Sequence, residues 1–313
     1  MERNILQKQW VVSILATFCS ALWGSAFPCI KLGYRLFQIE ADAVGSQIVF
    51  AGCRFFLAGI LTVILGSLLS RKLLIPDRSS WPSVLKLCLI QTVIQYLFFY
   101  IGLAHASGVK SAIITGTNSL LSILIASLIY RQEKLTGAKL IGCVLGFLGV
   151  ALANSGAGIS DLSFKWNGEG FVFISAVSYA FSSVLIKRYS ATANPVMLSG
   201  WQFTAGGLIL MAAGLIMGGS LTNVTAPALA MLLYLAFVSA AAYTLWGVLL
   251  KYNPVSRVSI FGFMNPVVGV LLSALFLKEG GQAFSVRNLT ALFLVCAGIW
   301  VVNRFQNNES VVH

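Results

Sequence analysis

Residues 96–131 read YLFFYIGLAHASGVKSAIITGTNSLLSILIASLIYR, and residues 243–278 repeat the pattern as YTLWGVLLKYNPVSRVSIFGFMNPVVGVLLSALFLK. The two stretches align without a gap at a shift of 147 positions. Apolar matches count for little, because unrelated apolar helices resemble one another by chance. The polar and aromatic matches are more informative, and they pair Tyr96 with Tyr243, Phe99 with Trp246, Lys110 with Arg257, Asn118 with Asn265 and Arg131 with Lys278. The pattern indicates an internal duplication.

The composition around this duplication is that of a membrane protein. Hydrophobic residues make up 58% of the 313 residues and charged residues 10%, whereas soluble domains carry about a quarter charged residues. The apolar residues form blocks of about twenty, the length of a helix that crosses a hydrocarbon core about 30 Å thick. The net charge of +12 is better explained by basic residues at helix ends than by nucleic acid, since no basic run exceeds two residues.

The blocks predict an all-α polytopic membrane protein with ten transmembrane helices. The predicted spans are 10–30, 47–70, 84–103, 107–130, 136–154, 168–187, 196–218, 227–250, 254–277 and 285–303. Residues 155–167 form the most polar link and are rich in turn residues, as expected of a linker between halves. The two predicted repeats are residues 10–154 (spans 1–5) and 168–304 (spans 6–10).

The distribution of basic residues predicts the orientation of the chain. The N-terminus, the even-numbered loops and the C-terminus carry fourteen lysines and arginines, whereas the odd-numbered loops carry six. This asymmetry places both termini in the cytoplasm. Five spans per half is an odd number, so the second half must enter the membrane from the opposite side. Inverted repeats are typical of transporters that bind solute between their halves and work by alternating access.

Short motifs along the chain resemble those of a known family. They are Trp23-Gly24-Ser25-Ala26-Phe27, Arg54-Phe55-Phe56, Gly102-Leu103, Glu133, Asn265-Pro266 and Leu277-Lys278-Glu279. In their order and spacing they resemble the EamA domain pair of the drug/metabolite transporter superfamily, over almost the whole chain. The resemblance implies a transporter or efflux protein. It does not specify the solute, which in this superfamily ranges over amino acids, other metabolites, drugs and nucleotide sugars.

Arg54 is the only charged residue well inside a predicted span. A buried charge is costly in a membrane unless it faces protein, water or a partner, so Arg54 is a candidate site for an anion or a carboxylate. The alternative is an arginine that extends to the outer interface or bonds to a helix end. In the duplication, Gln202 occupies the corresponding place.

Span three carries Gln91, Gln95, Tyr96 and Phe99 at helical spacing. Amides exposed to lipid would lack partners, so these side chains should face the bundle interior. The predicted substrate-binding residues are Trp23, Arg54, Gln91, Gln95, Tyr96, Tyr179, Gln202, Tyr243 and Trp246. Aromatic walls with a few amides suit amphipathic solutes, and packing between helices is the alternative role for each residue.

Three further features have structural and functional interpretations. Gly24 and Pro28 predict a gate or a kink in span one, because proline frees a carbonyl in the preceding turn. Asn118 and Asn265, deep in spans four and nine, are interpreted as hydrogen bonds between helices. The Gly142-x-x-x-Gly146 and Gly214-x-x-x-Gly218 motifs predict close helix packing.

Several residue types are informative by their absence. All nine acidic residues lie in predicted loops, tails or helix ends, which argues against proton coupling through a buried carboxylate; Glu133 is expected to pair with Arg131 or Lys134. The two histidines do not cluster and the six cysteines form no CxxC pair, so we expect no metal and no cofactor. No HExxH, GxSxG or GxxxxGK[ST] motif is present, which argues against an enzyme or an ATP-driven pump.

The leading hypothesis is a secondary transporter of a small organic metabolite in the cell membrane, specifically an exporter of amino acids or similar amphipathic solutes. The export direction comes from the family resemblance alone. A carrier of lipid intermediates or nucleotide sugars is the alternative. It would need more cations at the cavity than Arg54, and Lys110 and Arg257 pointing inward would favour it. A membrane-embedded enzyme is the hypothesis from a different class. The expected partners are the solute and the lipid bilayer, with no nucleic acid, and the chain is expected to be a monomer or homodimer.

Overall fold

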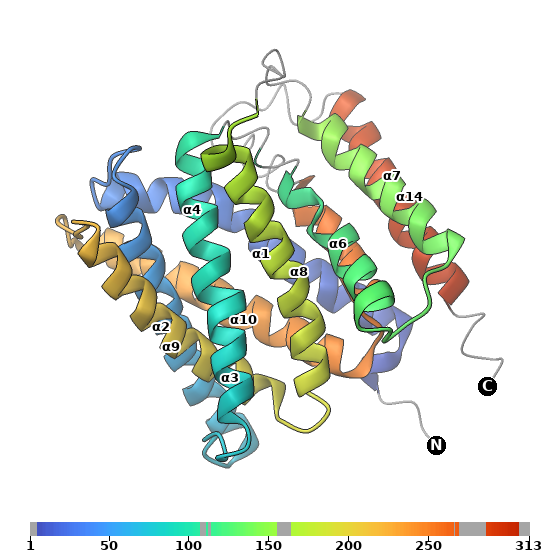
Figure 1. Ribbon diagram of the computed structural model, residues 1–313, viewed down its shortest axis with the longest axis horizontal. Coiled ribbons are helices and arrows are strands. Elements are labelled where there is room, and N and C mark those ends of the chain that lie inside the picture. The colour runs from blue at the N-terminus through green and yellow to red at the C-terminus, as the bar shows by residue number, and fades with distance from the viewer. Residues whose placement is uncertain are drawn as a thin grey trace.

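A computed structural model describes residues 5–106, 111, 114–154, 164–265, 267–268 and 286–306, and these residues form helices and no strands (Figure 1). The elements are η1 (Ile5–Gln7), α1 (Gln9–Leu36), α2 (Val44–Ser70), α3 (Trp81–Leu87), η2 (Cys88–Ile94), α4 (Gln95–His105), α6 (Asn118–Leu124), η3 (Ile125–Ile129), α7 (Gly137–Asn154), η5 (Trp166–Gly170), α8 (Phe171–Tyr189), α9 (Pro195–Ile216), α10 (Ala226–Tyr252), α11 (Val255–Ser259), η6 (Ile260–Phe263) and α14 (Val286–Gln306).

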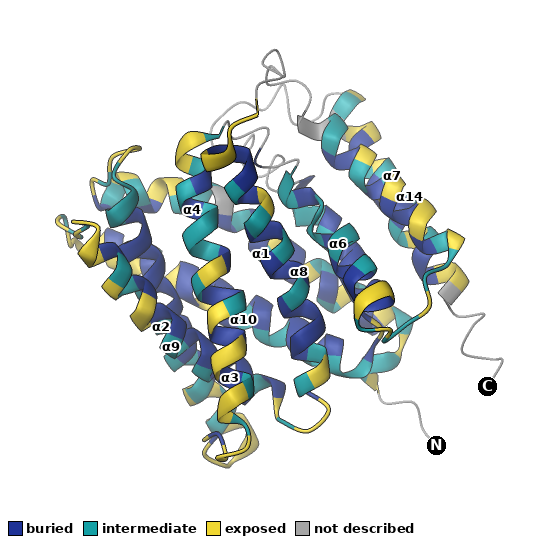
Figure 2. Ribbon diagram, viewed as in Figure 1, coloured by how far each residue is buried: buried dark blue, intermediate teal, exposed yellow. Residues whose placement is uncertain are grey.

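Six of the described helices are long and apolar enough to cross a membrane: Gln9–Leu36, Val44–Ser70, Trp81–His105, Trp166–Tyr189, Pro195–Ile216 and Ala226–Tyr252. Three shorter apolar helices accompany them, Ile114–Ile129, Gly137–Leu152 and Leu289–Phe305. Buried residues face the bundle interior, and exposed residues gather on outward faces such as those of α3 and α7 (Figure 2). The polytopic membrane fold is therefore confirmed. The count of ten stays a prediction, because residues 269–277 of the predicted ninth span lie outside the described part.

The ends of α9 follow from local sequence. Asn194 precedes the helix and its side chain accepts a hydrogen bond from the Val196 amide at 2.8 Å, while Pro195 occupies the first turn, where no donor is needed. At the other end Gly218 adopts φ +78°, and the Gly219 amide donates to the Gly214 carbonyl at 2.8 Å. A left-handed glycine with this hydrogen bond terminates a helix. The prediction that Gly218 packs against a neighbouring helix is wrong, since a Cβ atom added there would meet nothing within 4 Å.

Helices α2 and α9 pack more extensively than any other pair, and glycines every seven residues explain this (Figure 1). A Cβ atom on Gly52 would lie 2.9 Å from the Gly207 carbonyl oxygen, and one on Gly59 would lie 2.7 Å from that of Gly200. One on Gly214 would lie 2.7 Å from the Gly45 carbonyl oxygen. Such close approach of backbones requires glycine. Because residue numbers rise along α2 as they fall along its partner, the two helices are antiparallel.

Helices α7 and α14 form a second close pair on the opposite side of the bundle (Figure 1). The predicted packing role of Gly142 and Gly146 is confirmed. A Cβ atom on Gly142 would lie 2.8 Å from the Gly298 carbonyl oxygen, and one on Gly146 would clash with the Phe263 ring. A Cβ atom on Gly149 would lie 2.7 Å from the Ala291 carbonyl oxygen, so this pair is also antiparallel. Between the two pairs, α1 packs on α10 and α4 packs on α8.

A polar cluster joins the helix ends near the start of α1; it comprises Gln9, Glu133, Lys139, Lys187, Asn253, Ser256 and Arg257. The Glu133 carboxylate accepts hydrogen bonds from the Ser256 amide at 2.9 Å and hydroxyl at 2.5 Å. It also pairs with the Lys139 ammonium at 3.3 Å. The prediction that Glu133 pairs with Arg131 or Lys134 is therefore wrong. Lys139 lies on the first turn of α7, and its side chain is almost fully buried.

Candidate functional site

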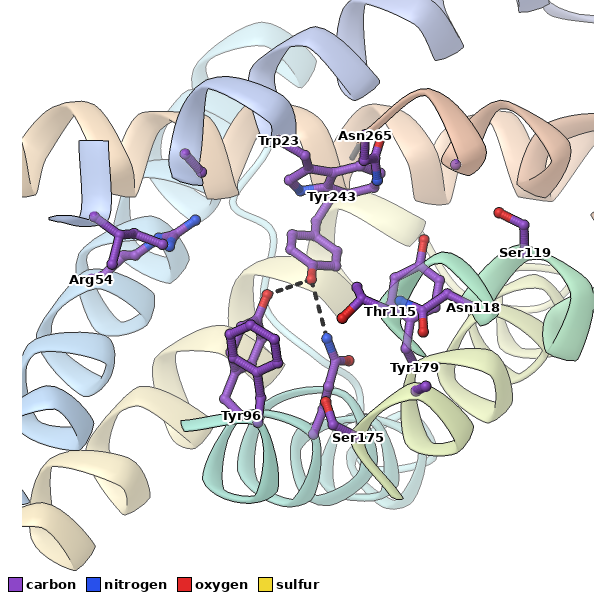
Figure 3. Close-up of a pocket in the computed structure, with 16 residues that line it drawn as sticks. Trp23, Arg54, Tyr96, Thr115, Asn118, Ser119, Ser175, Tyr179, Tyr243 and Asn265 are labelled. Carbon is purple, nitrogen blue, oxygen red and sulfur yellow. Dashed lines mark hydrogen bonds between the residues drawn. The ribbon is translucent and has the colours of Figure 1, made fainter. Parts of the chain in front are cut away.

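A cavity of about 120 Å³ lies at the centre of the bundle (Figure 3). It is lined by Trp23, Ala26, Ile30, Arg54, Gln95, Tyr96, Phe99, Thr115, Asn118, Ser119, Ser175, Ala176, Tyr179, Tyr243, Gly262 and Asn265. The lining residues of α1 lie in its second half and those of α8 in its first half. Since α1 begins and α8 ends at the polar cluster, these two helices line the cavity in the halves away from the cluster, whereas Tyr243 lies in the half of α10 nearer to it. Its volume is large enough for several waters or a small organic solute.

Two tyrosines related by the duplication meet in this cavity. The Tyr96 and Tyr243 hydroxyls are 2.5 Å apart, and the Gln95 amide donates to the Tyr243 hydroxyl at 3.5 Å (Figure 3). Phe55 and Phe203, which lie close in the corresponding helices, stack at 5.3 Å between ring centroids. Each phenylalanine contacts one tyrosine, at 4.3 Å for Tyr96 and 5.1 Å for Tyr243. The four rings form an aromatic wall to which both halves contribute equally. Its two tyrosines line the cavity, whereas the two phenylalanines lie behind them and do not.

Trp23 extends this wall from α1. Its ring makes edge contacts with Tyr243 at 4.9 Å and with Trp246 at 5.0 Å between centroids. Trp246 is buried behind Trp23 and does not line the cavity. The wall therefore has two layers on this side, and only the first lines the cavity.

Arg54 brings a positive charge to the cavity. It is 3% exposed, and its Nε atom donates to the Leu235 carbonyl at 3.2 Å and to the Ser239 hydroxyl at 2.9 Å on α10. The guanidinium carbon also lies 5.3 Å from the centroid of the Phe55 ring. Arg54 pairs with no carboxylate among the described residues. The Tyr100 hydroxyl is also a hydrogen-bond partner of the Arg54 side chain. The remaining donors of the terminal guanidinium nitrogens could bind a carboxylate or phosphate, groups that arginine binds in bidentate fashion.

Gln202 occupies the place of Arg54 in the second half and makes the corresponding contact. Its Oε1 atom accepts a hydrogen bond from the Thr92 hydroxyl at 2.6 Å, and Thr92 corresponds to Ser239 at the shift of 147 positions. Gln202 does not line the cavity. At this pair of positions the halves differ in charge, and the arginine is the member that reaches the cavity wall.

Six of the nine predicted substrate-binding residues line the cavity: Trp23, Arg54, Gln95, Tyr96, Tyr179 and Tyr243. Gln91, Gln202 and Trp246 do not, although all three are buried. Gly24 and Pro28 lie in α1, which continues through the proline. Neither residue lines the cavity, although Trp23 and Ala26 beside them do.

The cavity also contains residues that the sequence did not single out for binding. Thr115, Ser119 and Ser175 add hydroxyls, and Asn118 and Asn265 add amides. For the asparagines the sequence favours hydrogen bonds between helices. In the structure, however, neither Oδ1 atom has a partner among the described residues, although both atoms are buried. The symmetric placement of these asparagines is the sequence signal that could have assigned them to the cavity.

The chemistry of the lining favours binding over covalent catalysis. Among the described lining residues, hydroxyls, amides, one indole and one guanidinium are the polar groups, with no carboxylate or imidazole. The described residues contain no group of three histidine, cysteine or acidic side chains that could hold a metal ion. An aromatic cavity with few polar groups is the common form of a small-molecule site.

Comparison with protein families agrees with this geometry. The model of the EamA-like transporter family matches the chain twice, over residues 10–155 and 166–304. The chain belongs to the EamA-like transporter family. Proteins whose sequences are similar to this chain are transporters of the drug/metabolite type. The chain is therefore a multi-pass membrane transporter of small solutes.

Relatives share the architecture over most of their length. The uncharacterized transporter YvbV of Bacillus subtilis is 28% identical, covering 93% of this chain and 91% of that protein. The uncharacterized inner membrane transporter YedA of Escherichia coli is 28% identical, covering 90% and 87%. A protein of known crystal structure, 18% identical, superposes with a TM-score of 0.75 over 94% of this chain and 97% of that chain, which shows that the fold is shared.

Proposed function

We propose that this EamA-like protein is a secondary transporter that works by alternating access between two inverted five-helix repeats, residues 10–154 and 168–304. The packing of corresponding helices supports the inversion. Helices α2 and α9 correspond in the duplication and run antiparallel, and so do α7 and α14. Counterparts that run antiparallel at a shared interface are expected of inverted repeats. The contact of Tyr96 with Tyr243 near the centre of the bundle supports the same arrangement.

The proposed substrate is a small amphipathic solute with a carboxylate, such as an amino acid. The observation that carries this proposal is Arg54, a buried charge without a carboxylate partner in the described residues at the wall of an aromatic cavity. A buried charge is unfavourable when unpaired, so an anionic solute would supply the missing partner. Export is the proposed direction, by analogy with the family.

We propose that the structure represents a state in which the cavity opens at the end of the bundle opposite the polar cluster. On α1 and α8 the cavity lining lies in the halves away from the polar cluster. At the cluster itself, Glu133 joins the segment after η3 to the start of α11 through Ser256. With both termini in the cytoplasm, this state would face the outside. Alternating access then requires the polar cluster to separate.

The carrier of lipid intermediates or nucleotide sugars gains no support from Arg257. Its side chain donates twice to the Gln9 Oε1 atom, at 2.9 and 2.6 Å, within the polar cluster. Arg257 is therefore directed away from the cavity, and Lys110 lies outside the described residues. Among the described lining residues Arg54 is the only cation, and one positive charge balances little of the negative charge of a diphosphate group.

The transport proposal predicts that the aromatic wall controls affinity. We expect liposomes containing the wild-type protein to take up a radiolabelled aromatic carboxylate with saturable kinetics, and Tyr243→Ala to raise KM about tenfold. The truncation removes ring contacts worth about 0.5–1.5 kcal/mol and apolar burial besides. Gln95→Ala should raise KM less, because its hydrogen bond to Tyr243 is long. Wild-type kinetics in both variants would contradict the proposed cavity.

The inverted arrangement predicts opposite labelling of two corresponding loops. Asp77 lies between α2 and α3, and Asn223 lies in the corresponding loop between α9 and α10, with the exposed Thr225 two residues further on. In a background with the six native cysteines replaced by alanine, an impermeant maleimide applied to intact cells should label Thr225→Cys and not Asp77→Cys. Permeabilised cells should label both. Labelling of both variants in intact cells, or of Asp77→Cys alone, would contradict the proposed topology.

A further inference from the structure

The cavity has two chemically different ends. Arg54 lies on one side of the tyrosine pair, and Thr115, Asn118 and Ser119 lie on the other (Figure 3). The second side has hydroxyls and amides and, among its described residues, no charged group. A solute whose carboxylate binds Arg54 would extend past Tyr96 and Tyr243 toward this neutral end.

The amide oxygens of two asparagines in the cavity lack hydrogen-bond partners among the described residues. Asn118 comes from α6 and Asn265 follows η6, and these two elements pack against each other. The Oδ1 atom of each is buried without a partner in the described structure. By contrast, the Oδ1 atom of Asn253, in the polar cluster, accepts a hydrogen bond from the Arg257 guanidinium at 3.4 Å, and its Nδ2 atom donates to the Leu6 and Leu249 carbonyls. Buried amides usually find partners, because leaving them unpaired in an apolar medium is costly.

A third unpaired amide oxygen lies between the two ends. Gln95 is 6% exposed, and its Nε2 atom donates to the Tyr243 hydroxyl, which leaves the Oε1 atom without a partner in the described residues. The hydroxyls of Thr115 and Ser119 lie on the same side of the tyrosine pair as Asn118 (Figure 3). Unpaired amides and nearby hydroxyls offer both donors and acceptors, and such groups match a hydroxyl or amide on a ligand.

We infer that Asn118 and Asn265 form a second polar subsite, which binds an uncharged hydroxyl or amide at the end of the solute opposite its carboxylate. This inference rests on the proposed function, which supplies the carboxylate at Arg54. The subsite selects an uncharged group because it offers no countercharge. A lone cation would share the cavity with the positive charge of Arg54, which no described carboxylate balances. The cavity therefore prefers elongated solutes that are polar at both ends.

Three probes separate the two ends in a binding experiment. Para-hydroxyphenylpropionate carries both polar groups, phenylpropionate lacks the hydroxyl, and para-ethylphenol lacks the carboxylate. Isothermal titration calorimetry on the full chain in lipid nanodiscs, with empty nanodiscs as the blank, gives Kd for each. Wild-type protein should bind para-hydroxyphenylpropionate about tenfold more tightly than phenylpropionate, the effect of about one net hydrogen bond. It should bind para-ethylphenol more weakly than either carboxylate.

The variants Asn118→Leu and Asn265→Leu should each reduce the tenfold preference for the hydroxyl to about twofold or less. Their affinity for phenylpropionate should stay within about twofold of wild type, which shows that the cavity is intact. Asn303→Leu is the matched control, because Asn303 is a buried asparagine of α14 outside the cavity, whose Oδ1 atom also lacks a partner among the described residues. It should keep the wild-type preference.

The outcomes distinguish the subsite from the transport proposal. If the wild-type protein binds both carboxylates equally, or if both asparagine variants keep the preference, the subsite is wrong and the carboxylate site stands. If no carboxylate binds, the proposed substrate class and the subsite are both wrong. If an asparagine variant does not fold, Asn118→Ala and Asn265→Ala give the same comparison with smaller side chains that cannot form a hydrogen bond. A preference unchanged in these variants would contradict the inference.

Discussion

Replacing Arg54 with glutamine is expected to lower carboxylate uptake about a hundredfold at low solute concentration and to leave the protein folded. Hydrogen bonds to charged groups contribute about 1.5–3 kcal/mol, and a loss of about 2.7 kcal/mol corresponds to a hundredfold change. The second half of the chain shows how a glutamine fits at this place. Gln202 accepts a hydrogen bond from Thr92, so the new amide could accept one from Ser239, which corresponds to Thr92. The measurement is the initial rate of radiolabelled phenylpropionate uptake into proteoliposomes.

Two further variants define what the Arg54 result means. Arg54→Lys keeps the charge and loses the planar fork, so its uptake should lie between that of wild type and that of Arg54→Gln. Arg188→Gln removes the same charge at the end of α8, where Arg188 lies over the Tyr130 ring at 6.0 Å. That variant should transport at the wild-type rate. Unchanged uptake in Arg54→Gln would show that the arginine supports structure alone, which is the alternative that the sequence left open.

Much of the fold could be predicted because the physical constraints are strong. A helix that crosses a membrane must be apolar over about twenty residues, so the blocks in the sequence marked the described spans. The residues at which the helices begin and end are less predictable. The first span is expected from the sequence to stop at Ile30, yet α1 runs to Leu36, because membrane helices can extend into polar sequence beyond the core. The antiparallel glycine contacts of α2 and α9 could not be predicted, since the sequence does not reveal which helices meet.

The site could be predicted in part, for a similar reason. Residues that are unusual in a membrane, such as Arg54 and Gln95, were recognisable as candidates, and both line the cavity. Burial alone does not distinguish residues that line the cavity from residues packed behind them. Trp246 is as buried as a cavity residue and lies behind Trp23. The role of Asn118 was predicted from its residue type, and the structure changes that interpretation because it shows the amide oxygen without a partner among the described residues.

Placing leucine at Gly52 is expected to destabilise the protein severely. A Cβ atom there would lie 2.5 Å from the backbone nitrogen of Met211 and 2.9 Å from the carbonyl oxygen of Gly207. These are backbone atoms, so α2 and α9 would have to separate along their whole interface. Overpacking of a tight contact costs about 3 kcal/mol or more when the backbone must move. We expect a lower midpoint of thermal unfolding in detergent, followed by tryptophan fluorescence, and a large loss of monodisperse protein on size-exclusion chromatography.

The matched control is Gly137→Leu, at the start of α7, where a Cβ atom would have nothing within 4 Å. This variant should keep the wild-type midpoint, because leucine favours a helix more than glycine does. Gly207→Leu should resemble Gly52→Leu, since both glycines lie at the same helix crossing. The double variant should cost less than the sum of the two, because the first substitution already separates the helices that the second would push apart. Additive losses, or a stable Gly52→Leu protein, would contradict the close antiparallel contact on which the inverted arrangement depends.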